Sequence, residues 1–104
     1  DNDAPHDDLI AASDFVLMHG NGKNTTQIQQ MIDQVRASSA YKARPCPIVF
    51  NEDPNFEFNE KVNNMEVAVS NHASWGFYDQ GTNDYQDGYQ SPPTDWRGNT
   101  NDKQ

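Results

Sequence analysis

The chain has 104 residues, of which 34% are hydrophobic, and 16 acidic residues against 7 Lys and Arg give a formal net charge of -9. This length allows one small domain, the acidic surface is a poor match for the phosphates of nucleic acid, and no apolar run approaches the roughly 20 residues of a membrane span. The single cysteine, Cys46, excludes a disulfide framework and a multi-cysteine metal site. From the charge, the short apolar runs and the single cysteine together, we expect the protein to bind no nucleic acid, membrane, metal or cofactor.

The chain begins with a cluster of carboxylates, and no Lys or Arg precedes Lys23. The aspartates among its first eight residues are Asp1, Asp3, Asp7 and Asp8. A run of like charge is typical of a solvated segment, and we expect a solvated start to the chain. Calcium binding by these residues is an alternative, although the spacing of an EF-hand is absent.

Three short apolar runs predict strands near residues 14–19, 47–52 and 74–79. The first two runs are continuous and the third is weaker, and each is followed by residues that favour turns, such as Gly20, Pro54 and Gly81. Continuous apolar runs are typical of strands that are buried on both faces, as in parallel sheets. The sequence therefore predicts three parallel strands.

The connection between the first two runs has the pattern of an amphipathic helix near residues 25–40. Asn24 can cap it, and Gln27 completes a capping box. The apolar residues follow the spacing i, i+3, i+4, i+7 and are Ile28, Met31, Ile32 and Val35. One face of this helix should therefore pack against the sheet.

The second connection predicts a helix near residues 58–71. Its apolar residues fall on one helical face and are Phe58, Val62, Met65 and Val69, although Asn63 and Asn64 lie in the middle of the pattern. The order is thus strand–helix–strand–helix–strand, which predicts an α/β fold with a βαβαβ topology and right-handed crossovers. Residues 80–104 have the composition of a long loop.

This βαβαβ unit has too few helices to bury a parallel sheet. Strands buried on both faces need cover on both sides, either from more helices or from closure into a barrel. We therefore expect residues 1–104 to be a fragment of a larger chain. The alternatives are a subunit that another chain completes and a small domain with long additional segments.

Polar or aromatic residues lie at the carboxyl end of each predicted strand: His19, then Asn51, Glu52 and Asp53, then Trp75 with Asp79 beyond it. In parallel α/β folds, functional sites gather at this edge of the sheet. Glu52 ends an apolar strand, so we expect its carboxylate at the margin of the core, where it can act as a nucleophile or as an acid/base. The alternative is an ordinary residue at a strand end, and for His19 it is a histidine that bonds to the backbone.

Aromatic residues are concentrated near the end of the chain, where six of the 11 lie between Trp75 and Trp96. Tyr78, Tyr89 and Trp96 alternate there with Asp, Asn and Gln residues. Aromatic faces next to carboxylates and amides suit a polyhydroxylated ligand, so these residues and Trp75 are candidates for binding carbohydrate. For Trp75, packing in the core is the alternative.

The order of His19, Glu52 and Trp75 at three successive strand ends resembles the last three strands of cellulase-like (β/α)8 glycosidases. These enzymes belong to the large retaining clan of barrel glycoside hydrolases. Residues 49–53, 74–79 and 87–96 are similar to a bacterial group of this kind, and the resemblance covers roughly residues 9–100. It implies that residues 1–104 form the C-terminal part of a TIM barrel.

The resemblance implies retaining hydrolysis of a β-linked polysaccharide or glycoside, with Glu52 as the nucleophile. His19 and Asn51 would hold ligand hydroxyls or the carboxylate, and Trp75 would stack on the sugar. Asn51–Glu52 also resembles the Asn-Glu pair of the fourth-strand acid/base, which would make Glu52 the proton donor. The second carboxylate would come from the rest of the barrel. Such an enzyme is expected in an extracellular or periplasmic location.

Two other functions fit parts of the pattern. A carbohydrate-binding protein would use the aromatic residues without needing a pair of carboxylates. An acidic interaction protein or calcium-binding protein would use the aspartates near the ends of the chain.

Overall fold

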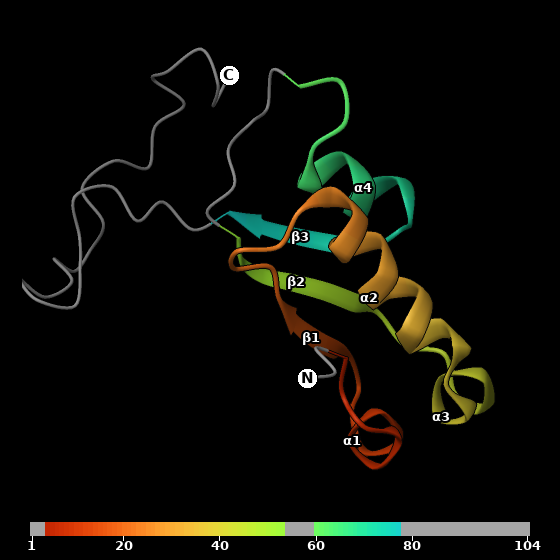
Figure 1. Cartoon of the computed structure of the whole chain (residues 1–104). Coiled ribbons are helices and arrows are strands. Elements are labelled where there is room, and N and C mark those ends of the chain that lie inside the picture. Colours follow the sequence, from red (N-terminus) through yellow and green to blue (C-terminus); the bar gives the residue numbers. More distant parts are fainter. Residues whose placement is uncertain (1–3, 54–59, 78–104) are drawn as a thin grey trace, which may run out of the picture.

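The computed structural model describes residues 4–53 and 60–77 (Figure 1). The helices are α1 (Asp7–Ala12), α2 (Thr25–Ala37), α3 (Ser39–Ala43) and α4 (Asn64–Ser70). The strands are β1 (Val16–His19), β2 (Ile48–Asp53) and β3 (Ser74–Phe77).

The three strands form one parallel sheet in the order β1-β2-β3. The register of β1 and β2 runs from Val16 opposite Ile48 to His19 opposite Asn51. Each strand therefore pairs with the next strand along the chain. The predicted α/β class with three parallel strands is confirmed.

Helix α2 has the capping box that its sequence predicts. The Asn24 side chain accepts a hydrogen bond from the Gln27 backbone N–H, and the Gln27 side chain accepts one from the Asn24 backbone N–H, both at 2.9 Å. The four apolar residues of the predicted face are all buried. The helix ends at Ala37, because Ser38 is extended and its side chain caps the separate helix α3.

Helix α4 begins later than predicted. Asn63 is its N-cap, and its side chain accepts a hydrogen bond from the Glu66 backbone N–H at 2.9 Å. A side chain that bonds to a free backbone N–H favours the start of a helix over its interior. The predicted apolar face is wrong, since Val62 and Val69 are each 59% exposed, and Asn64 and Ala68 are the buried residues. Phe58 lies outside the described residues.

Part of the acidic start of the chain is helical, which the sequence analysis did not predict. Asp7 and Asp8 lie in the first turn of α1, where carboxylates favour a helix by interacting with its dipole. Asp7 also accepts a hydrogen bond from the Ser39 hydroxyl at 2.7 Å, which links α1 to α3. Ile10 is buried and joins the core.

The core lies between one face of the sheet and the helices α2 and α4. Val16, Met18, Ile48 and Phe50 are buried on this face. The two connecting helices lie side by side on it (Figure 1), joined by hydrogen bonds between the Gln29 and Asn71 side chains at 2.7 and 3.2 Å and by bonds from Arg36 to Asn71. Successive crossovers therefore pass over the same side of the sheet.

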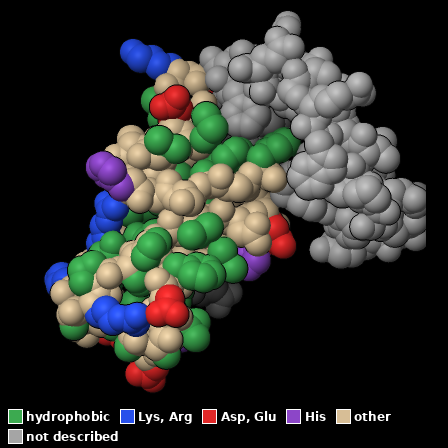
Figure 2. Space-filling view, turned by 180° about the vertical axis from the view of Figure 1, so that it is seen from behind, with side chains coloured by type: hydrophobic (Ala, Val, Ile, Leu, Met, Phe, Trp, Pro, Cys, Tyr) green, Lys and Arg blue, Asp and Glu red, His purple; other side chains and the backbone are tan. Residues whose placement is uncertain are grey.

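The opposite face of the sheet keeps large hydrophobic side chains exposed. Leu17 alternates with the buried Val16 and Met18 and is 45% exposed, and Phe15 is 51% exposed. Figure 2 views the molecule from behind and shows hydrophobic side chains gathered at the surface. Within residues 4–53 and 60–77, both connecting helices lie on the other side, so this face is left open.

The turn after α4 holds a residue in an unfavourable conformation. His72 follows the C-cap Asn71 with φ of 54°, a left-handed conformation that favours glycine. We expect His72→Gly to raise the free energy of unfolding by about 1 kcal/mol, measured by urea denaturation. His72→Ala is the matched control, because it removes the imidazole without relieving the backbone. Equal stability of the two variants would contradict this prediction.

Candidate functional site

The carboxyl ends of the three strands meet at one edge of the sheet. β1 ends at His19, β2 ends with Asn51, Glu52 and Asp53, and β3 ends at Phe77. Trp75 is the second residue of β3, so it does not lie at the carboxyl end where the sequence predicts it. The parallel register places His19 opposite Asn51 on neighbouring strands. This is the edge at which parallel α/β folds hold their functional groups.

A β-bulge in β2 decides which side chains face which way. Phe50 pairs with Trp75 and Asp53 pairs with Phe77, so three steps along β2 match two steps along β3. Glu52 has a φ of 56°, which is a left-handed conformation. An extra residue in one strand shifts the alternation of side chains beyond it. As a result Phe50 and Asp53 are both buried, while Glu52 is exposed.

Glu52 and His19 are two predicted site residues whose side chains the structure brings into direct contact. The His19 Nδ1 and Glu52 Oε2 atoms are 3.1 Å apart, and the two side chains are 60% and 48% exposed. The sequence predicts Glu52 at the margin of the core, whereas the bulge turns its side chain to the solvent. A histidine nitrogen at this distance can orient a carboxylate that acts as a nucleophile or as an acid/base.

Asp53 lies at the predicted strand end, but the sequence does not reveal its buried role in the site. It is fully buried, and its Oδ2 atom accepts hydrogen bonds from Trp75 Nε1 and from Asn64 Nδ2, both at 2.8 Å. Asn64 also donates to the Lys23 carbonyl oxygen at 2.9 Å. One carboxylate thus connects β2, β3 and the start of α4. Its only sequence signal was its position next to Glu52.

Trp75 does not join His19 and Glu52. Its register partner is the buried Phe50, it packs against the core, and its ring stacks with that of Phe77 at a centroid distance of 5.9 Å. Side chains paired across parallel strands lie on the same face, so Trp75 lies on the helix side of the sheet. His19 and Asn51 alternate with the buried Met18 and Phe50 and lie on the open side.

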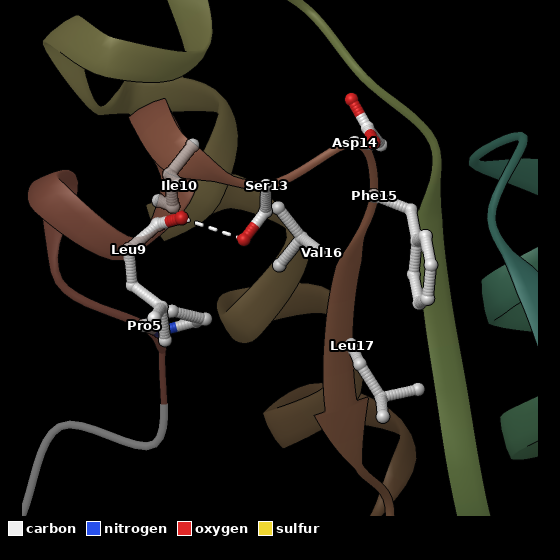
Figure 3. A pocket seen from close by; sticks show the side chains of 8 residues that line it. All are labelled: Pro5, Leu9, Ile10, Ser13, Asp14, Phe15, Val16 and Leu17. Carbon is white, nitrogen blue, oxygen red and sulfur yellow. Dashed lines mark hydrogen bonds between the residues drawn. The ribbon is translucent and has the colours of Figure 1, made fainter.

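The remaining predicted ligand residues, Tyr78, Tyr89 and Trp96, lie outside the described residues. An apolar cavity of about 330 Å³ lies between α1 and the start of β1. Figure 3 shows the side chains that line it, which include Leu9, Phe15 and Leu17. This cavity is at the opposite end of β1 from His19.

In the described ranges, no group of three or more His, Cys, Asp or Glu side chains is arranged to hold a metal ion.

Gly20 makes room for Asp53. A Cβ atom added at Gly20 would lie 2.8 Å from Asp53 Cβ and 3.1 Å from its Cγ, which is closer than side chains pack. We expect Gly20→Ala to lower the free energy of unfolding by about 1–3 kcal/mol, measured by chemical denaturation. Gly76→Ala is the control, since its nearest contact would be an ordinary 3.4 Å to the Phe50 carbonyl oxygen. An equal effect of both substitutions would contradict the close contact.

Comparisons of this chain with protein-family models, with curated proteins and with solved structures find no match. Across the residues described, none of the helices is both long enough and apolar enough to cross a bilayer.

Proposed function

We propose that this chain is the C-terminal part of a (β/α)8 barrel glycosidase that hydrolyses a β-linked polysaccharide or glycoside with retention of configuration. Glu52 supplies one of its two catalytic carboxylates. The observation that carries this proposal is the contact between Glu52 and His19 at the carboxyl edge of a parallel sheet. The resemblance of the strand-end residues to barrel glycosidases supplies the reaction.

The winding of the sheet supports the barrel. Each strand lies next to its neighbour in sequence, and both crossover helices lie on the same face. A barrel repeats this arrangement, whereas a doubly wound sheet reverses it at a switch point and places helices on both faces. The open face with Leu17 would then be part of the barrel interior, where branched apolar side chains fill the centre.

The position of Glu52 supports a catalytic role. Its left-handed backbone conformation is unfavourable for a residue other than glycine, and such strain is concentrated at functional sites. In the nucleophile assignment Glu52 attacks the anomeric carbon, His19 orients its carboxylate, and Asn51 binds sugar hydroxyls. In the acid/base assignment Glu52 protonates the leaving oxygen. The partner carboxylate comes from the rest of the barrel.

The aromatic residues have two different roles in this proposal. Tyr78, Tyr89 and Trp96 extend the sugar-binding cleft, as their sequence context suggests. For Trp75 the contacts favour packing over stacking on a sugar, because its ring lies against the core and its Nε1 donates to Asp53. The ligand is a carbohydrate, and the enzyme works in an extracellular or periplasmic location.

A second candidate function is carbohydrate binding without hydrolysis. The exposure of Glu52 favours it, since a side chain that is 48% exposed is well hydrated and catalytic carboxylates act in sites from which water is excluded. In the glycosidase, closure of the barrel and its loops would bury Glu52. A carbohydrate-binding protein does not need Glu52 to be buried.

The two candidates differ in what the full-length protein does to β-linked oligosaccharides. Proton NMR of the first products formed should show the same anomeric configuration as the substrate, because a retaining enzyme passes through a covalent intermediate. The intact mass of the native polypeptide should be about 25 kDa or more, the size of a whole barrel. Binding without products would support the second candidate, and inverted products would contradict the retaining mechanism.

A further inference from the structure

We propose that Asp53 is a positioning residue whose buried carboxylate holds the β-bulge that presents Glu52 to His19. The catalytic meaning of this inference rests on the proposed function, but its geometric part does not. Asp53 itself lies on the helix side of the sheet and would not contact the substrate.

The anchor of the bulge is the buried carboxylate. Asp53 is fully buried, and its Oδ2 atom takes the 2.8 Å hydrogen bonds from Trp75 and Asn64. A buried carboxylate is strongly unfavourable without such donors, and bonds to an ionised acceptor are about twice as strong as neutral ones. These two hydrogen bonds therefore hold the Asp53 side chain on the helix side of the sheet.

The bulge determines on which side of the sheet the Asp53 and Glu52 side chains lie. Ile48 and Phe50 are buried, so regular alternation would bury Glu52 next and turn Asp53 to the open side. The extra residue reverses this, and the left-handed conformation of Glu52 absorbs the change of direction. Loss of the Asp53 anchor would allow the two side chains to exchange faces, which would remove Glu52 from His19.

The anchor also reaches β1. Gly20 follows His19 directly, its N–H donates to the Asn51 carbonyl oxygen at 3.0 Å, and the absence of its side chain leaves the space that Asp53 fills. His19 thus directly precedes Gly20, and Glu52 directly precedes Asp53. Gly20 and Asp53 lie against each other. The geometry explains how two exposed side chains are held together.

The test uses the His19 imidazole as a reporter in the full-length protein. With ¹³C-labelled histidine at one fixed pH, Glu52→Gln should move the His19 Cε1–Hε1 signal, and the loss of that signal in His19→Gln assigns it. We expect Asp53→Leu and Gly20→Ala to move the signal toward its position in Glu52→Gln, since each displaces the anchor. Asp53→Asn keeps an oxygen acceptor and should leave the signal near its original position.

Ile28→Ala is the control for lost stability, because Ile28 is a buried α2 residue on the core face. It should leave the His19 signal unchanged. An unmoved signal in folded Asp53→Leu and Gly20→Ala, an equal movement in Ile28→Ala, or no response to Glu52→Gln would each overturn the proposal. If Asp53→Leu does not fold, Gly20→Ala decides, because it keeps the carboxylate and only shifts its position.

Activity separates this inference from the proposed function. On a β-linked oligosaccharide, Asp53→Leu should lower kcat by about 100-fold with little change in KM, as expected for a misplaced catalytic group, and Asp53→Asn should restore most of it. The expected His19 response in a protein that hydrolyses nothing would uphold the positioning role and reject the glycosidase. Hydrolytic activity without the expected change in the His19 signal would uphold the glycosidase and reject the positioning role of Asp53.

Discussion

Replacing Glu52 by Gln in the full-length protein is expected to lower kcat by about 10⁴-fold or more, with oligosaccharide binding changed only a few-fold. Glutamine keeps the size and the hydrogen-bonding oxygen of the side chain, but it can neither attack an anomeric carbon nor give up a proton. Steady-state kinetics on a β-linked aryl glycoside measure the loss, and calorimetric titration measures binding. Near-normal turnover would exclude Glu52 from catalysis.

Glu60→Gln is the matched control for this substitution. Glu60 is an exposed acid that precedes α4, and its backbone oxygen accepts a hydrogen bond from the Asn63 side chain at 3.4 Å. The charge change is therefore the same, while the strand-end site is untouched. We expect unchanged kinetics for this variant.

Azide distinguishes the two roles that Glu52 can have. Glu52→Gly removes the carboxylate and also suits the left-handed backbone at this position. If Glu52 is the nucleophile, azide should attack an activated β-glycoside from the vacated face, displace the leaving group and give the α-glycosyl azide. If Glu52 is the acid/base, the covalent intermediate still forms, and azide should give the β-glycosyl azide.

Leu17→Ala in the full-length protein is expected to lower the free energy of unfolding by about 2–5 kcal/mol, the cost of a cavity in a packed core. In the structure described here Leu17 is 45% exposed. The large cost follows only if the open face of the sheet is the inside of a barrel. Phe50→Ala on the helix side should cost about 3–5 kcal/mol in any case, since Phe50 is fully buried.

Val69→Ala is the control for Leu17, because Val69 is an exposed apolar residue on the outer side of α4. Its effect should lie within about 0.5 kcal/mol of zero. Chemical denaturation of the three variants gives the comparison. If Leu17→Ala costs no more than Val69→Ala, the face is solvated in the whole protein and the barrel is wrong.

The elements that local sequence determines were predictable. The capping box at Asn24 and the spacing from Ile28 to Val35 specify α2, and unbroken apolar runs specify the strands. The helical spacing does not reveal the start of α4, because Asn63 and Asn64 fall inside the apolar pattern, whereas Asn63 is the N-cap.

The site was only partly predictable, because it depends on pairing between distant strands. The sequence places His19 and Glu52 at strand ends, but the bulge that exposes Glu52 and buries Asp53 is a property of the register between β2 and β3. The same register puts Trp75 on the helix side. No local pattern around residues 50–53 distinguishes a regular strand from a bulged one.

We propose that Glu52 is one of a pair of catalytic carboxylates in a completed barrel. A crystal structure of the full-length protein tests it most directly. We expect a second Glu or Asp, from a strand that precedes β1, with its carboxyl group about 5–5.5 Å from that of Glu52. An open, unclosed sheet, or a closed barrel with no acidic side chain within about 6 Å of Glu52, would contradict the claim.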